Sequence, residues 1–384
     1  MIPLRNAKRF FYKACRQPGY AFKVFNKRTG AYLCYRLRDG RSNYPEAITL
    51  FLTHRCNLRC RMCGQWGESG VTKRESGRHI KEDMSIEELK KIIDDIAAFR
   101  PNITLFGGEP LLHKNCMEIA RYVKKKGMHC LMITNGSLIE CLAEELVDSG
   151  LDELNVSIDG KMMLHDEIRG MQGLYEKIIN GLRQVNRFRM KKNRKRPLIN
   201  LQCTITRHNY HHPEQMTEVA KEAGADSLTF HNLIFISRDL IGKQREIDKS
   251  LNCSSVNWEG FVFEPRIEPD VLYEKIEKIK KSRYGFPVDF YPDFSRKELK
   301  EYYQNHSYLP GGDSVRCVSP WMTAYIFPDG DMRPCLNFDY SFGNLGRDRF
   351  SLLWNNERAI KYRRMLKEKK IFPVCVRCTE LYRY

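Results

Sequence analysis

The sequence predicts an α/β fold in which parallel strands alternate with helices, followed by a smaller C-terminal domain. The main observation is a regular alternation, from residue 46 to residue 235, of short apolar runs with helical patterns of about 10–15 residues, which is typical of βαβ units. A second observation is length, because 384 residues with 42% hydrophobic side chains can bury a large core and a small one. The alternation alone leaves open whether the sheet is a barrel segment or doubly wound, but both bind ligands at the C-terminal ends of the strands.

The alternating pattern consists of six strands and five helices. Strands are expected at residues 47–53, 103–106, 129–134, 153–158, 199–205 and 227–233. Helices are expected at residues 85–99, 111–126, 138–149, 174–189 and 213–223. Each crossover helix returns the chain so that the next strand runs parallel to the last, which puts the C-terminal ends of all these strands at one edge of the sheet. Polar motifs that follow a strand are therefore expected to lie together.

The chain before this pattern forms an N-terminal extension, residues 1–45. Residues 5–15 predict a short basic helix, and residues 20–38 predict a β-hairpin around the turn at 26–30. We expect the extension to cap the bottom of the main domain. Peripheral contact with a membrane surface through the basic N-terminus is the alternative interpretation.

Three further regions complete the predicted organisation. The main domain covers residues 46–235, and a bridge at 236–310 contains a helix at 269–282 and a strand at 286–291. The bridge breaks the earlier alternation and leads into a second domain at residues 311–384.

Composition indicates a globular protein of the cytoplasm. No apolar stretch reaches the roughly 20 residues that span a bilayer, and the N-terminus lacks the apolar run of a secretory signal. The 14 cysteines are therefore expected to be reduced or bound to metal. The net charge is +18, but no nucleic-acid-binding motif accompanies it, so no nucleic-acid partner is predicted.

Three cysteines follow the first predicted strand with the spacing C-x3-C-x2-C: Cys56, Cys60 and Cys63. One loop with this spacing can bind three corners of a four-iron cluster, which leaves the fourth iron open to another ligand. A structural zinc site formed by the three thiolates and His54 is the alternative.

This cysteine loop resembles the signature of the radical S-adenosylmethionine (SAM) superfamily, and further motifs follow later strands in the same order. The resemblance implies a partial (β/α)6 TIM-like barrel in which SAM binds the open iron of a [4Fe–4S] cluster. Reductive cleavage of SAM then gives a 5′-deoxyadenosyl radical that abstracts hydrogen from a substrate carbon. The SAM-binding positions that the resemblance implies are Met62, Gly107, Gly108, Glu109, Pro110, Thr134, Asn135, Ser157, Asp159 and Arg169.

A second cysteine set lies near the C-terminus, where a turn at residues 328–330 predicts a hairpin that brings two of its members together. The set comprises Cys317, Cys335, Cys375 and Cys378. Four thiolates can bind zinc or an iron–sulfur cluster. With Gly330 and Trp354, the pattern resembles the SPASM/twitch domains of radical SAM enzymes, which implies one fully ligated auxiliary [4Fe–4S] cluster.

The resemblance implies a radical SAM oxidoreductase or transferase whose auxiliary cluster relays electrons during oxidation or bond formation. A flavodoxin- or ferredoxin-type electron donor is the expected partner. Maturation of a ribosomally synthesised peptide, or modification of a lipid or lipid-linked substrate, are the alternative reactions, and a zinc-binding scaffold is the non-enzymatic one. The sequence identifies neither the substrate nor a catalytic acid or base.

Overall fold

The computed structural model describes residues 15, 18–75, 83–311 and 315–383. In these ranges the α-helices are α2 (Pro18–Leu37), α3 (Val71–Glu75), α4 (Ile86–Ala97), α5 (Cys116–Lys125), α6 (Ile139–Asp148), α7 (Met163–Arg169), α8 (Leu174–Lys191), α9 (Gln215–Glu222), α10 (Arg238–Leu251), α11 (Pro269–Lys281), α12 (Arg296–Gln304), α13 (Phe350–Trp354) and α14 (Glu357–Lys369). The strands are β1 (Ala47–Phe51), β2 (Asn102–Phe106), β3 (Cys130–Thr134), β4 (Glu153–Ser157), β5 (Leu198–Ile205), β6 (Ser227–Asn232), β7 (Val288–Tyr291), β8 (Thr323–Ile326), β9 (Asp331–Arg333) and β10 (Gly343–Asn344).

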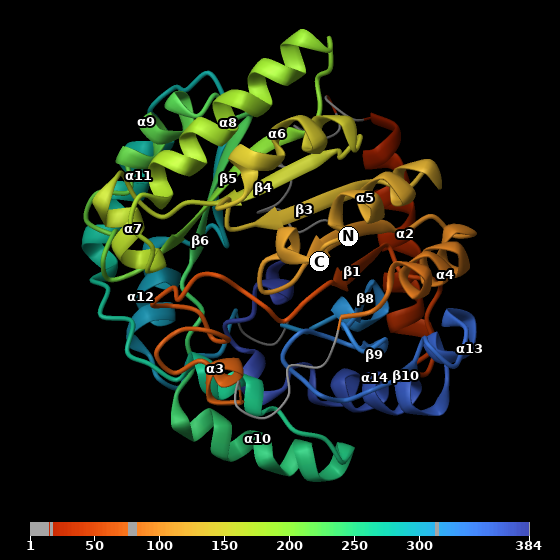
Figure 1. Cartoon of the computed structure of the whole chain (residues 1–384). Helices are drawn as coiled ribbons and strands as arrows, with labels where there is room; N and C mark the ends of the chain where they lie inside the picture. The colour runs from red at the N-terminus through yellow and green to blue at the C-terminus, as the bar shows by residue number, and fades with distance from the viewer. Residues whose placement is uncertain (1–14, 16–17, 76–82, 312–314, 384) are drawn as a thin grey trace.

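All these strands belong to one ten-stranded sheet in the order β10-β9-β8-β1-β2-β3-β4-β5-β6-β7. Strands β1 to β7 are parallel, and β8 joins the edge of β1 in parallel, so that Leu50 pairs with Leu105 on one side and with Ile326 on the other. Strands β9 and β10 continue the sheet in antiparallel pairing. Helices surround the curved sheet in Figure 1, as expected for a partial α/β barrel.

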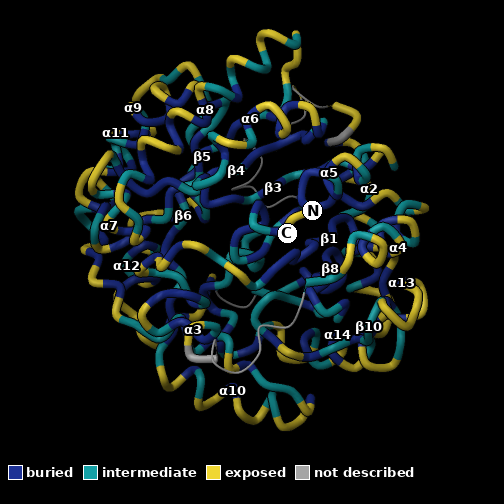
Figure 2. The backbone as a smooth tube through the Cα atoms, in the orientation of Figure 1, coloured by how far each residue is buried: buried dark blue, intermediate teal, exposed yellow. Residues whose placement is uncertain are grey.

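Burial alternates along the strands because one face of the sheet packs against helices. On β5, Leu201 and Cys203 are buried, whereas Gln202 and Thr204 on the opposite face are only partly buried. Figure 2 shows the same contrast, with the strands mostly buried and the outer surfaces of the helices exposed. The apolar face therefore forms the core with the helices, and the polar face lines the inside of the barrel.

The predicted strands and helices of the main domain are confirmed, with ends that differ by a few residues. The bridge is more closely integrated than expected, because its strand β7 pairs in parallel with β6 and extends the barrel. The C-terminal domain likewise contributes β8 to the edge of β1. Both additions cover a sheet edge that would otherwise present unpaired backbone groups.

The predicted hairpin at residues 20–38 is wrong, because this segment forms the single helix α2. Its buried side chains Ala21, Val24, Ala31 and Cys34 recur with helical spacing and pack against the domain, which outweighs the turn propensity of Gly30. Of the helix predicted at residues 5–15, all but Cys15 lies outside the described residues.

Helix α2 lies across the N-terminal ends of the strands, as expected for a cap over the bottom of the barrel. The Lys27 ammonium donates to the backbone carbonyl of Phe99 (2.8 Å) just before β2, and Arg28 forms an ion pair with Glu46 (2.7 Å) just before β1. None of the helices in the described ranges combines the length and apolar character needed to cross a membrane.

Candidate active site

The first cysteine loop leaves the C-terminal end of β1 and folds back on itself. The Cys63 amide donates to the Cys60 carbonyl (3.1 Å), and the Trp66 indole donates to the His54 carbonyl (2.9 Å). The thiol groups of Cys56, Cys60 and Cys63 are close enough to influence one another electrostatically. Burial raises the pKa of the Cys60 thiol to about 11. The loop therefore gathers its three cysteines at the end of the barrel where ligands are expected.

The Gly107–Gly108 pair, which follows β2, packs directly against this loop. The Gly108 amide donates to the Thr53 carbonyl (2.8 Å), and the Glu109 amide donates to the Arg55 carbonyl (2.9 Å). A Cβ atom at Gly108 would lie 2.3 Å from the Arg55 carbonyl oxygen, and one at Gly107 would lie 2.7 Å from that of Thr53. Because the two glycines lack side chains, the backbone after β2 can pack directly against the backbone of the cysteine loop.

The Glu109 carboxylate is fully buried and accepts three hydrogen bonds. The donors are the Thr134 hydroxyl (2.7 Å), the Asn135 amide (2.7 Å) and the Leu111 amide (3.0 Å). Burial raises the pKa of Glu109 to about 7, although these hydrogen bonds act in the opposite direction. Its backbone is extended (φ −137°, ψ 110°), as predicted for a residue that precedes proline, and Pro110 begins the 3-10 turn Pro110–Leu112.

Asn135 connects this carboxylate to the cysteine loop. Its side-chain amide donates to the Asn57 side-chain oxygen (2.9 Å) and lies 3.8 Å from the Cys56 sulfur. The structure therefore brings the predicted residues Glu109, Thr134 and Asn135 together beside Cys56. The involvement of Asn57 was not predicted, since a single asparagine within the cysteine loop gives no distinctive sequence signal.

Arg169, at the end of α7, lies between Cys60 and Asp159. Its Nε is 2.6 Å from the Asp159 Oδ2, and its Nη1 donates to the Cys60 sulfur at 3.8 Å. Burial disfavours the charged guanidinium, but the Asp159 carboxylate and the Cys60 sulfur outweigh this effect and raise the pKa of Arg169. The other Asp159 oxygen accepts from the Thr204 amide (2.7 Å), which fixes the carboxylate against β5.

The remaining predicted SAM-binding residues lie near these two groups in the fold. Met62 is half-buried within the cysteine loop and packs against the core. Ser157 is the last residue of β4, half-buried on the inner face of the sheet, where its register partner on β5 is Gln202.

The donor set fits an iron–sulfur cluster with an open iron. Three cysteines of one loop supply one thiolate per iron, and the buried Glu109 and Arg169 flank them with groups that recognise an amino group and a carboxylate. Within the part of the chain that the structure describes, no three His, Cys, Asp or Glu side chains have the spacing for a single metal ion.

The second cysteine set lies around the β8–β9 hairpin. The antiparallel pairing of β8 and β9 confirms the predicted hairpin, and Gly330 adopts the left-handed conformation (φ 80°) in its turn. Cys378, Cys317 and Cys335 all act electrostatically on the pKa of the Cys375 thiol, and Cys317 and Cys335 act on that of Cys378. The four thiols therefore lie in one region. Burial raises the pKa of the Cys335 thiol to about 11. The set supplies four thiolates, enough to ligate every iron of one cluster.

Two residues near this set had not been singled out from the sequence. The buried Arg377, between the last two cysteines, donates to the backbone carbonyls of Tyr302 (2.9 Å) and Asn305 (2.8 Å), which attaches the C-x2-C segment to the end of α12. Cys253, which follows α10, is close enough to Cys335 for an electrostatic effect on its pKa. Its position about 80 residues earlier in the chain gave no spacing signal.

An aromatic cluster connects the two cysteine regions. It consists of Phe51 at the end of β1 and Tyr325 and Phe327 at the end of β8, and Cys335 packs against it. Phe51 and Phe327 stack with ring centroids 5.3 Å apart, and the His54 ring lies 4.8 Å from that of Phe51. Since His54 belongs to the first cysteine loop, one small cluster contacts both cysteine regions.

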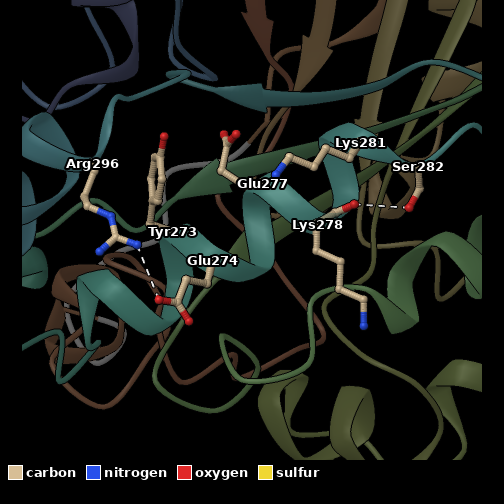
Figure 3. Close-up of a pocket in the computed structure, with 7 residues that line it drawn as sticks. All are labelled: Tyr273, Glu274, Glu277, Lys278, Lys281, Ser282 and Arg296. Atoms are coloured by element: carbon tan, nitrogen blue, oxygen red, sulfur yellow. Dashed lines mark hydrogen bonds and ion pairs between the residues drawn. The ribbon is translucent and has the colours of Figure 1, made fainter.

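A hollow of about 610 Å³ lies elsewhere, on the outer surface along α11 (Figure 3). It is lined by Tyr273, Glu274, Glu277, Lys278, Lys281, Ser282 and Arg296. Arg296 donates to the Glu274 carboxylate (3.3 Å), so the hollow is bordered by exposed, mutually paired charges. It contains none of the predicted site residues.

Comparison with known protein families gives two matches that together cover more than half of the chain. The profile of the radical SAM superfamily matches residues 50–199, which include the cysteine loop and the strand-end motifs. The profile of the SPASM iron–sulfur cluster-binding domain matches residues 317–379, which include the second cysteine set.

Individual relatives cover most of the chain. Fe-coproporphyrin III synthase of Methanosarcina barkeri is 28% identical over 325 residues, which are 79% of this chain and 72% of that protein. The subtilosin biosynthesis protein AlbA of Bacillus subtilis is 23% identical over 330 residues, which are 83% of this chain and 62% of that protein. Among solved structures, Streptococcus suis SuiB bound to SAM shares the fold with a TM-score of 0.59 at 15% identity, covering 88% of this chain and 72% of that one.

The sequence matches, the parallel sheet and the two cysteine regions agree with one another. They identify an enzyme whose cofactors are SAM, a [4Fe–4S] cluster and auxiliary iron–sulfur cluster binding by the C-terminal domain, which supplies the second set of cysteine ligands. The chain belongs to the radical SAM superfamily and ends in a SPASM iron–sulfur cluster-binding domain.

Proposed function

We propose that this enzyme abstracts a hydrogen atom from a substrate carbon and completes a two-electron oxidation or bond formation. When bound, the first cluster and SAM would supply the 5′-deoxyadenosyl radical, and an auxiliary cluster held by the C-terminal cysteines would supply an acceptor for the electron that the substrate loses. A flavodoxin or ferredoxin is the proposed donor of the first electron. The chain's own residues bind, orient and shield these groups.

The residues beside the first cysteine loop are the proposed binding partners of two groups of SAM, its amino group and its carboxylate. We infer that Cys56, Cys60 and Cys63 bind the cluster and that Glu109, supported by Thr134 and Asn135, accepts from the SAM amino group. Arg169 carries five N–H donors, of which one faces Asp159 and another faces Cys60. Its other donors are the proposed partners of the SAM carboxylate, and Asp159 orients the guanidinium for this task.

The observation that carries the proposal is the aromatic cluster between the two cysteine regions. Phe51 and Phe327 are buried and stacked, the His54 ring lies near both of them, and Cys335 packs against the same cluster. The cluster belongs to adjacent, hydrogen-bonded strands, β1 and β8, so the two cysteine regions are held in a fixed relation. In this arrangement, a substrate inside the barrel would lie near the first iron–sulfur cluster at the strand ends and near the second beside the aromatic cluster of β1 and β8.

The substrate class that we favour is a tetrapyrrole with carboxylate side chains. The relative from Methanosarcina barkeri is named Fe-coproporphyrin III synthase, and it matches 79% of this chain. The net charge of +18 would also attract a substrate that carries several carboxylates.

A peptide substrate is the second candidate. It is favoured by the similarity to AlbA, which is named for the biosynthesis of the bacteriocin subtilosin. Both candidates require the same hydrogen abstraction, so one assay distinguishes them: release of 5′-deoxyadenosine should increase only with the correct substrate class.

The auxiliary cysteines provide the direct test of the proposed reaction. In anaerobically reconstituted protein, Cys375→Ala/Cys378→Ala should lower the iron content from about eight to about four per chain. It should still release 5′-deoxyadenosine but should no longer form oxidised product with a porphyrin or peptide substrate, as measured by mass spectrometry.

The matched control is Cys141→Ala, which removes an exposed thiol on α6 and should change neither iron content nor product. Full turnover by the double variant would show that the second cysteine set takes no part in the reaction.

A further inference from the structure

Helix α2 presents an apolar face to the outside of the molecule. Phe22, Leu33 and Leu37 are 69%, 50% and 80% exposed, and Phe25 beside them is 43% exposed. Phe22 and Leu33 are eleven residues apart, close to three full turns at 3.6 residues per turn, and Leu37 follows one turn later. These large side chains therefore share one face of the helix. On it, the exposed Asn26 and Thr29 separate an apolar pair near the start of α2 from Leu33 and Leu37 near its end.

The outward face is fixed, because the opposite face of α2 is firmly attached to the barrel. Ala21 and Cys34 are buried there, and three polar contacts reinforce the packing. Lys23 donates to the Arg100 carbonyl (2.7 Å), Lys27 donates to the Phe99 carbonyl (2.8 Å), and Arg28 pairs with Glu46. The helix cannot rotate to bury Phe22 and Leu37 without breaking these contacts.

The described chain around this face is basic. Residues 18–45 contain six lysines and arginines and one acidic residue, Asp39. On α2 itself, Arg36 is exposed beside Leu37, and Arg38 and Arg41 are exposed just beyond the end of the helix. Asp39 is paired with Arg364, a further cation.

We propose that the outward face of α2 docks on the surface of an anionic lipid bilayer. Large apolar side chains on an outward helix face can enter the interface of such a membrane while flanking cations attract its anionic headgroups, so burial and charge act together. A second copy of the chain fits less well, because it would oppose two strongly basic surfaces.

The position of α2 also fixes the orientation of the docked enzyme. The helix crosses the N-terminal ends of β1 and β2, whereas the first cysteine loop follows the C-terminal end of β1. Docking through α2, the red helix labelled in Figure 1, therefore leaves the cysteine loop directed away from the bilayer. The face is a tether for the enzyme and is separate from the active site.

Flotation of the reconstituted full-length protein with lipid vesicles tests this proposal. Wild-type protein should float with vesicles that mix phosphatidylcholine and phosphatidylglycerol, and much less with phosphatidylcholine alone. Phe22→Ser/Leu33→Ser/Leu37→Ser should reduce the bound fraction about tenfold, since it removes the apolar contribution and leaves the charge. Release of 5′-deoxyadenosine by this variant should match the wild type, because α2 lies outside the active site.

The matched control replaces three exposed apolar residues on other surfaces, Met190→Ser/Leu309→Ser/Leu352→Ser, and should float like the wild type. Equal flotation of the α2 variant and the wild type, or no flotation of either, would overturn the proposal. A third outcome would also overturn it: in sedimentation experiments without lipid, the wild type is a dimer and the α2 variant is a monomer. The outward face of α2 would then bind a second copy of the chain. None of these outcomes depends on the reaction proposed above.

Discussion

Arg169 and Asp159 form a buried ion pair beside the first cysteine loop, with 2.6 Å between Nε and Oδ2. The Asp159 side chain has no exposed surface, and that of Arg169 is 11% exposed. Removing one partner of a buried pair leaves an uncompensated charge, which costs more than removing both. The pair therefore holds Arg169 against Cys60, and each of its two charges is stable in the interior only while the other is present.

We expect Arg169→Gln to lower the free energy of unfolding of the cluster-free protein by about 3–5 kcal/mol, as measured by urea denaturation. The double variant Arg169→Gln/Asp159→Asn should recover much of this loss. As a control, Arg296→Gln breaks a pair whose side chains are both nearly half exposed and should cost less than about 1 kcal/mol. A double variant as unstable as the single one would contradict the pairing.

Glu109 predicts a pH dependence of SAM binding. Burial raises its pKa to about 7, so below this pH the free protein mostly holds the protonated form, which no longer attracts the SAM amino group. The affinity should therefore rise with pH and level off above pH 7, with a change of about tenfold between pH 6 and pH 8. Equilibrium dialysis with labelled SAM measures this dependence.

Glu109→Gln is the control for this profile, because it keeps the shape of the side chain and removes its titration. The variant should bind SAM more weakly at pH 8 and show a flatter profile, to which only the titration of SAM itself contributes. The interpretation fails if wild type and variant have parallel profiles.

Gly108→Ala tests the contact between the two backbone segments. A Cβ atom 2.3 Å from the Arg55 carbonyl oxygen must displace the cysteine loop, so we expect the variant to lose iron and to bind SAM at least about tenfold more weakly. Gly242→Ala on α10 is matched to it, since a Cβ atom there meets nothing within 4 Å. Normal iron content in Gly108→Ala would show that the loop accommodates the extra methyl group.

Arg363 on α14 should be essential for the attachment of the C-terminal domain. It is fully buried over the Trp354 ring, 4.1 Å from its centroid, and donates to the carbonyls of Pro320 (2.8 Å) and Trp354 (2.8 Å). Lysine cannot reproduce this fork of donors, so Arg363→Lys should cost about 2–4 kcal/mol of unfolding free energy.

Limited proteolysis provides the second measurement for this variant. Cleavage of Arg363→Lys should begin near the bridge and the C-terminal domain, whereas Arg364→Lys, which alters an exposed pair with Asp39, should resist like the wild type. Equal protease resistance of the two variants would show that the buried guanidinium is dispensable.

Much of the site was predictable from the sequence, because its members follow consecutive parallel strands. Glu109 follows β2, Thr134 ends β3 and Asp159 follows β4, and the parallel fold brings such positions to one edge. The spacing of Cys56, Cys60 and Cys63 likewise predicts cluster binding, because all three ligands belong to a single loop.

What the sequence alone determined was therefore local: the periodicity of strands and helices, the cysteine spacing and the order of the strand-end motifs. The tertiary structure decided the rest, including the helix at residues 18–37 instead of a hairpin, the addition of β7 and β8 to the sheet, and the placement of Cys253 near Cys335. The physical reason is that the periodicity of a helix or strand depends only on residues that are close together in the sequence. Sheet edges, buried ion pairs and outward helix faces depend instead on which distant segments pack together.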